Sequence, residues 1–192
     1  MGCNEGRCNG EGTKINSFAL VSYLPDPLAQ FLDRLRNDLV EECFSKAHVT
    51  VLPPRPMKGS PEQAWVQVQE KVQDFQPFVV ELGKVEIFAV TNVIYLSVNS
   101  GHAELKRLHQ VLNADVLKFE EPFEYHPHVT LAQDLDIAQV PAAAELAARR
   151  WQEFPHSRSV VVNRLTFVQN TLENRWSDLY GFVLSSRVPH LR

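Results

Sequence analysis

The sequence predicts an α+β fold made of two copies of one unit that are related by pseudo-twofold symmetry. The order strand, helix, strand, helix, strand occurs twice along the chain. The third element of each copy carries a similar tetrapeptide, His48-Val49-Thr50-Val51 in the first and His128-Val129-Thr130-Leu131 in the second. No linker separates the copies, so we expect two lobes of a single domain.

Chain length and composition are ordinary for a globular protein. The chain has 192 residues, of which 44% are hydrophobic and 22% are charged. We expect a flexible tail at residues 1–13, where glycine and polar residues dominate, followed by one domain at 14–192. Within that domain the first repeat spans about 14–90 and the second about 91–192.

In the first repeat, apolar periodicity and proline punctuation define the elements. The expected order is a buried strand at 15–24, a helix at 28–39, a short β-branched strand at 47–52, a helix that begins after Ser60, and a strand at 78–89. Pro53-Pro54 should end the short strand. Ser60 should cap the second helix, with Pro61 in its first turn. Gly83 should bend the last strand.

The second repeat follows the same logic. The expected elements are a strand at 92–98, a helix from near His102 through Leu112, a strand at 128–132, a helix around 140–151, and a hairpin of strands 160–169 and 176–184 joined by the polar loop 170–175.

Each tetrapeptide should place an imidazole and a hydroxyl on one face of its strand. Residues i and i+2 of a strand point to the same side, so His48 projects with Thr50, and His128 with Thr130. The apolar residues that alternate with them should point into the core. Two such faces brought together by the symmetry would form a four-residue site.

That site suits acid–base chemistry at phosphorus. Histidine has an unperturbed pKa near 6.5, so one imidazole can take a proton from water while the other protonates the leaving oxygen. The threonine hydroxyls can donate hydrogen bonds to non-bridging phosphate oxygens. The scheme requires no metal or other cofactor. His126 and His128 are spaced as a metal-binding pair could be, but no third ligand is evident.

On these residues the sequence resembles the 2H phosphoesterase superfamily, which includes 2′-5′ RNA ligase-like proteins and cyclic nucleotide phosphodiesterases. The family pattern is a pair of His-x-Thr/Ser-x motifs with apolar x, and both are intact here. The residues just before the second motif, Tyr125-His126-Pro127, are also similar to those that precede it in the family. The resemblance extends from Ile15 to the C-terminus.

The resemblance implies a two-lobed fold in which antiparallel sheets line a central cleft, with the helices outside. It also implies hydrolysis of cyclic phosphodiesters, such as RNA 2′,3′-cyclic ends, to monoesters. His48 and His128 would be the acid–base pair, and Thr50 and Thr130 the phosphate clamps. We assign water activation to His128 and protonation of the leaving oxygen to His48, an order that the symmetry of the motifs leaves open.

Five further residues are candidates for substrate binding. Arg55 and Lys58 follow the first motif and could approach a phosphate, although loop cations are more often simply solvated. Phe123 and Tyr125 precede the second motif and could stack on a base or pack at the rim. Gln133 stands where cyclic-phosphodiesterase relatives often carry arginine, and its amide can hydrogen-bond phosphate without the arginine's charge.

Charge restricts the partners. The net charge of −4 disfavours a long nucleic-acid backbone and favours a nucleotide or short RNA that carries a cyclic or 2′-5′ phosphodiester. Alternatives are 2′-5′ RNA joining or cleavage, and a non-catalytic nucleotide-binding module. We expect a monomer without a membrane span. The three cysteines show no metal-ligand pattern, which indicates a reducing, cytoplasmic location.

Overall fold

The computed structural model describes residues 12–40 and 45–184, so most of the expected tail at 1–13 lies outside the described residues. The elements are β1 (Lys14–Tyr23), α1 (Leu28–Leu39), β2 (His48–Arg55), α2 (Pro61–Val72), β3 (Phe78–Ile87), β4 (Ile94–Ser100), α3 (His102–Leu112), a short 3-10 helix (Asp115–Leu117), β5 (His128–Ala132), α4 (Val140–Gln152), β6 (Ser159–Val162), β7 (Arg164–Thr171) and β8 (Trp176–Val183). No helix among the described residues is both long and apolar enough to cross a bilayer.

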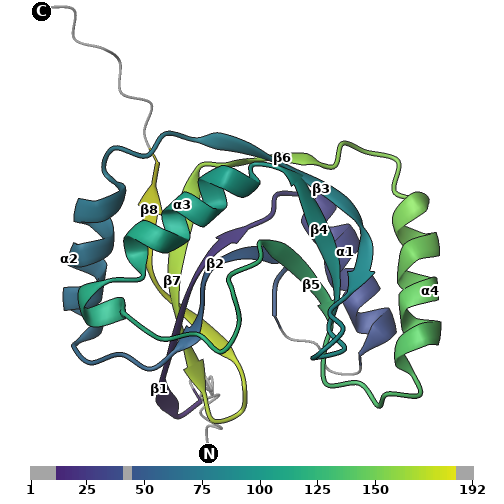
Figure 1. Cartoon of the computed structure of the whole chain (residues 1–192), viewed down its shortest axis with the longest axis horizontal. Helices are drawn as coiled ribbons and strands as arrows, with labels where there is room; N and C mark the ends of the chain where they lie inside the picture. Colours follow the sequence, from purple (N-terminus) through teal and green to yellow (C-terminus); the bar gives the residue numbers. More distant parts are fainter. Residues whose placement is uncertain (1–11, 41–44, 185–192) are drawn as a thin grey trace, which may run out of the picture.

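The strands form two antiparallel sheets of four strands each (Figure 1). One sheet has the order β2-β1-β7-β8 and the other β5-β4-β3-β6. The motif strands β2 and β5 therefore occupy equivalent edge positions, each beside the first strand of its own repeat. The α+β class and the pseudo-twofold arrangement of two antiparallel sheets are confirmed.

The lobes do not coincide with the repeats along the chain. The first repeat contributes β1 and β2 to one sheet, but its last strand, β3, pairs with β4 in the other. The second repeat contributes β4 and β5, and its strand β7 returns to pair with β1. The two sheets do not follow the expected division near residue 90, because the repeats exchange strands. Each sheet therefore contains strands from both halves of the chain.

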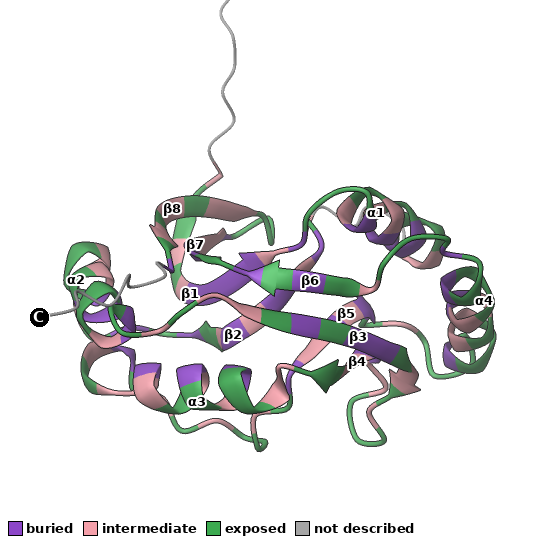
Figure 2. Ribbon diagram, turned by 90° about the horizontal axis from the view of Figure 1, so that it is seen from above, coloured by how far each residue is buried: buried purple, intermediate pink, exposed green. Residues whose placement is uncertain are grey.

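Each sheet is covered by one helix from the first repeat and one from the second (Figure 1). α1 and α4 contact each other and pack on the sheet that contains β5 and β3. α3 packs against β2, and α2 covers the same sheet through Trp65, which stacks on Tyr180 of β8. Figure 2 shows the helices exposed outwards and buried on the side that meets the strands.

Local sequence signals explain several element boundaries. Ser60 caps α2 as predicted. Its hydroxyl accepts a hydrogen bond from the Gln63 backbone N–H, and the Gln63 side chain accepts one from the Ser60 N–H, which completes a capping box. The register of β3 shifts between Leu82 and Val85, which places the predicted irregularity at Gly83.

Two expectations about the strands were wrong. β2 does not stop at Pro53-Pro54 but continues to Arg55, because an edge strand can accommodate residues that lack an N–H. The expected strand at 160–169 is two strands that separate at Asn163. β6 pairs with β3 in one sheet, and β7 pairs with β1 and β8 in the other.

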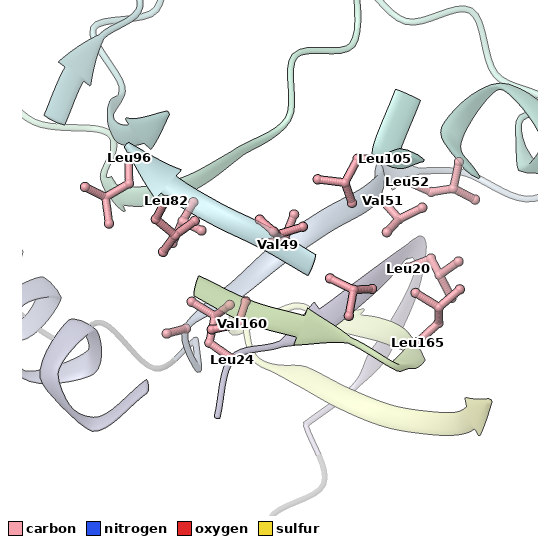
Figure 3. Packing of buried hydrophobic residues seen from close by; sticks show 14 of the residues in the cluster. Leu20, Leu24, Val49, Val51, Leu52, Leu82, Leu96, Leu105, Val160 and Leu165 are labelled. Atoms are coloured by element: carbon pink, nitrogen blue, oxygen red, sulfur yellow. The ribbon is translucent and has the colours of Figure 1, made fainter. Parts of the chain in front are cut away.

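One apolar cluster extends through both lobes. Figure 3 shows leucine and valine side chains from strands of both sheets, including Val49, Leu82 and Leu165, within this cluster. The apolar residues of the motifs belong to it: Val49 and Val51 are fully buried, and Val129 and Leu131 are 1% exposed. The predicted alternation of the motif strands is therefore observed, and the core fixes these strands from behind.

The substitution Leu131→Ala should lower the free energy of unfolding by about 2–5 kcal/mol, because it removes buried apolar volume and leaves a cavity. Leu172→Ala is the matched control, since Leu172 is 68% exposed in the turn after β7. It should change the unfolding free energy by less than about 0.5 kcal/mol. Urea denaturation measures both values, and similar losses in the two variants would contradict the inward orientation of Leu131.

Candidate active site

The two motifs occupy matching positions at the sheet edges. In one sheet, His48 lies opposite Tyr23 of β1 and Thr50 lies opposite Val21. In the other, His128 lies opposite Ser97 of β4 and Thr130 opposite Tyr95. All four motif side chains are half-buried, in contrast with the buried residues between them.

The edge strands β2 and β5 contact each other at the centre of the molecule, where Figure 1 shows them side by side. The two histidines are close enough that a positive charge on His128 disfavours protonation of His48. The fold therefore brings together two motifs that are far apart in the sequence, as the pseudo-symmetry predicts.

Both imidazoles are held in the same orientation by the backbone. Nδ1 of His48 lies 2.6 Å from the carbonyl oxygen of Lys46, and Nδ1 of His128 lies 2.6 Å from that of His126. A carbonyl oxygen only accepts, so each Nδ1 carries the hydrogen and each Nε2 of a neutral ring keeps its lone pair. The two motifs thus present two chemically equivalent nitrogen atoms.

The surroundings make the two histidines unequal in basicity. Burial lowers the pKa of His48 to about 4, with contributions from the positive charges of Arg36 and His128, and against the opposing effect of the Lys46 carbonyl. Burial also lowers the pKa of His128, but less strongly, and the nearby His126 adds to the effect. A single proton shared by the pair therefore resides preferentially on His128.

The Tyr23 ring lies beside His48 and is itself held by polar groups. The Tyr23 ring meets the imidazole edge-on at a centroid distance of 6.4 Å, and the Tyr23 hydroxyl donates to Asp178 Oδ1 of β8 at 2.5 Å. The ammonium of Lys46 lies 5.2 Å from the centre of the Tyr23 ring. Burial and the Asp178 carboxylate raise the pKa of Tyr23, so its hydroxyl stays a donor.

A stacked pair of aromatic rings lies beside His128. Phe88 and Tyr95 stack at a centroid distance of 3.9 Å, and the His128 ring meets them edge-on at 5.0 and 5.4 Å. The His126 ring contacts the same pair at 5.4 and 5.7 Å. The Tyr95 hydroxyl donates to Glu86 at 3.1 Å.

Sequence reasoning missed these flanking residues. Tyr23 could have been identified only from the register that places it opposite His48, and Phe88 follows a strand with no motif of its own. Asp178 lies on β8 and approaches the site because β7 and β8 join the sheet of β1. Only long-range pairing brings these groups to the motifs.

The structure does not bring Arg55 or Lys58 to the motifs. Arg55 is 2% exposed and its guanidinium is occupied by an ion pair with Glu121 and by hydrogen bonds to Asn113 Oδ1 at 2.9 Å and to the Leu117 carbonyl at 3.1 Å. Lys58 is exposed beyond the far end of β2, which at the usual strand rise is roughly 20 Å from His48. The expectation that Arg55 binds a substrate phosphate does not agree with its buried contacts.

The remaining candidates also differ in their placement. Tyr125 is not free to stack on a base, because its ring lies against His109 at 4.0 Å and its hydroxyl donates to the Thr50 carbonyl at 2.7 Å. Phe123 is 57% exposed, so its ring is accessible. Gln133 is exposed after β5 and donates to Asp134 at 3.1 Å.

Residues 12–40 and 45–184 contain no cluster of side chains that could hold a metal ion. No three histidine, cysteine, aspartate or glutamate side chains in these segments come together as ligands. The His126 and His128 rings both lie against the Phe88–Tyr95 pair.

Solved structures share this fold. Escherichia coli LigT in complex with 3′-AMP superposes with a TM-score of 0.60 at 14% identity, covering 92% of this chain and all of LigT. Usb1 of Kluyveromyces marxianus gives a TM-score of 0.55 at 12% identity over 87% of this chain and 98% of its own. At these identities the likeness establishes the fold.

Sequence comparisons establish the family. The protein BH1439 of Halalkalibacterium halodurans, provisionally named a phosphoesterase, is 24% identical in an alignment of 146 residues that covers 71% of this chain and 82% of BH1439. The family model of the 2′-5′ RNA ligase superfamily matches residues 24–174, a span that contains both motifs, the whole β5-β4-β3-β6 sheet, and strands β2 and β7 of the other sheet. The chain therefore belongs to the 2′-5′ RNA ligase superfamily, the group of 2H phosphoesterases.

Proposed function

We propose that this protein is a metal-independent phosphoesterase that hydrolyses a cyclic phosphodiester, the 2′,3′-cyclic phosphate of a nucleotide or RNA end. One observation carries the proposal. Two half-buried imidazoles on adjoining edge strands are oriented identically by backbone carbonyls, each with a threonine on the same face. Membership of the 2H family supports phosphate ester chemistry at these residues.

The reaction needs one proton acceptor and one proton donor. Nε2 of a neutral histidine takes a proton from water as the water oxygen attacks phosphorus. The bond between phosphorus and one ring oxygen breaks, and the imidazolium of the other histidine protonates that oxygen. The product is a phosphomonoester with a free neighbouring hydroxyl, and the total number of protons on the two histidines is unchanged. Each proton transfer contributes about 10²–10⁴-fold in rate.

The unequal pKa values favour His128 as the acid and His48 as the base. His128 holds a shared proton more strongly, whereas His48 remains neutral down to about pH 4. This order is the reverse of the one assigned from the sequence. A bound phosphate anion would raise both pKa values, because a negative charge stabilises the imidazolium. The Thr50 and Thr130 hydroxyls would hold its non-bridging oxygens.

The substrate class is supported by chemistry and by the relatives. LigT has been crystallised with phosphate, with 3′-AMP, with ATP and with NADP⁺, all of which contain phosphate. The net charge of −4 on this chain favours a small phosphate compound over a long RNA. The aromatic group beside His128 would accommodate a nucleoside better than a bare phosphate.

The family name favours a second candidate, in which the same residues join or cleave a 2′-5′ linkage. A third possibility is a nucleotide-binding module without turnover. A panel of cyclic phosphates and short 2′-5′ and 3′-5′ oligonucleotides distinguishes these functions, because only the joining and cleaving activities change oligonucleotide length.

Replacement of either motif histidine should abolish most hydrolysis. We expect His48→Ala and His128→Ala each to lower kcat on a 2′,3′-cyclic nucleotide by about 10²–10⁴-fold in buffer with EDTA. His156→Ala is the control, since His156 is exposed in the loop before β6. An open-chain diester with a nitrophenolate leaving group needs no acid, so on it His128→Ala should lose far less activity than His48→Ala. Full activity of either alanine variant on the cyclic substrate would exclude the mechanism.

The pH dependence of kcat/KM should be acidic. Both pKa values lie below 6.5, so the singly protonated enzyme decreases about tenfold per pH unit above that value. It also decreases as the pH approaches about 4, where the His48 base becomes protonated. A pH–rate profile of cyclic-nucleotide hydrolysis should therefore peak between these limits. A rate that stays constant up to pH 9 would contradict a protonated histidine as the acid.

A further inference from the structure

A buried polar network joins the two motifs, and the proposed mechanism does not use it. It consists of Arg55, His109, Glu121 and Tyr125, which come from β2, from α3 and from the segment that leads into β5. Three of these residues donate to backbone carbonyls of β2. The question is whether the network only stabilises the fold or also sets the geometry of the site.

The carbonyls that the network engages belong to an irregular edge strand. The register of β2 against β1 shifts between Leu52 and Thr50, which leaves Val51 as the extra residue of a β-bulge. His109 Nδ1 donates to the Val51 carbonyl at 2.9 Å, and the Tyr125 hydroxyl donates to the Thr50 carbonyl at 2.7 Å. Arg55 Nε donates to the Pro53 carbonyl at 2.9 Å. These carbonyls thus have donors from side chains.

Tyr125 differs from the other members because of its position. It lies three residues before His128, and its hydroxyl contacts the backbone of Thr50 in the other motif. Its ring is parallel to that of His109 within 4°, at a centroid distance of 4.0 Å. Burial and the Glu121 carboxylate raise the pKa of the Tyr125 hydroxyl, which keeps it a donor. This hydrogen bond therefore connects the segment that precedes the His128–Thr130 motif to the strand that carries the His48–Thr50 motif.

The rest of the network holds this tyrosine in place. His109 Nε2 lies 3.4 Å from Glu121 Oε1, and the same carboxylate oxygen pairs with the Arg55 guanidinium. Both carboxylate and guanidinium are at most 12% exposed, so water competes little for these contacts. The Val51 carbonyl holds the His109 ring through Nδ1, and the ring stacks on Tyr125.

We propose that Tyr125 is a positioning residue that fixes the spacing between the His48–Thr50 motif and the His128–Thr130 motif through its hydrogen bond to the Thr50 carbonyl. The inference rests on the proposed function of the two motifs. Catalysis that uses two groups on separate strands is sensitive to their separation, and a misplacement of about 1 Å can cost a factor of about 100. The hydroxyl ties the two motifs together without touching the substrate.

Tyr125→Phe tests this proposal, because it removes the hydroxyl and keeps the ring on His109. Tyr180→Phe is the matched control, since the Tyr180 hydroxyl donates to Glu62 at 3.1 Å on the outside of the molecule. Two quantities are measured at a temperature where both variants are folded by their melting curves. The first is kcat/KM on a 2′,3′-cyclic nucleotide. The second is the Kd of inorganic phosphate from the NMR shifts of the His48 and His128 rings.

We expect Tyr125→Phe to lower kcat/KM about tenfold and to weaken phosphate binding several-fold, whereas Tyr180→Phe should change neither. A merely stabilising role would lower the melting temperature of Tyr125→Phe without changing either quantity in the folded protein, and that result would overturn the proposal. If the wild type binds phosphate but does not hydrolyse cyclic nucleotides, the proposed function fails. Weaker phosphate binding by Tyr125→Phe would then still support the positioning role.

Discussion

The contact between two edge strands is the constraint on which the rest of the structure depends. β2 and β5 each pair with a neighbour on one side only, and they meet at the centre of the molecule. Neither sheet contains a complete site, because each supplies one histidine and one threonine. The apolar core behind both motifs and the exchange of β3 and β7 between the repeats therefore serve the site as much as the fold.

Burial of the histidines disfavours their protonation, and under the proposed function a phosphate substrate would offset this cost. The pKa values of His48 and His128 both lie below the ordinary value for histidine, so both imidazoles are neutral in the free protein at neutral pH. Neutral imidazoles do not attract an anion by charge. It gains a local environment in which a bound anion and a proton stabilise each other strongly. Proton uptake and phosphate binding are then linked. In the proposed mechanism, the protonated His128 would then form next to the leaving oxygen.

The sequence predicted the parts of the structure that depend on local patterns. The alternation of the motif strands, the Ser60 cap and the helix between Leu28 and Leu39 follow from periodicity and capping chemistry, and the structure has all three. Strand exchange could not be predicted, because pairing partners depend on packing across the whole chain. The same holds for Arg55: a cation in a predicted loop is expected in water, and nothing local indicates that Glu121, 66 residues away, pairs with it.

The fold is symmetric, but the surroundings of the two motifs are not. This difference would favour one orientation of a bound phosphodiester over the other. Tyr23, which contacts Asp178 and the Lys46 ammonium, lies beside His48, whereas the stacked Phe88 and Tyr95 lie beside His128. Two equivalent histidines could bind a phosphodiester in either orientation and exchange roles. A stacked aromatic pair lies beside His128 and only the single Tyr23 ring beside His48, so under the proposed function the nucleoside would lie on the His128 side. The attacking water would then lie beside His48. This imidazole is the more weakly basic of the two, so it remains neutral and can accept a proton.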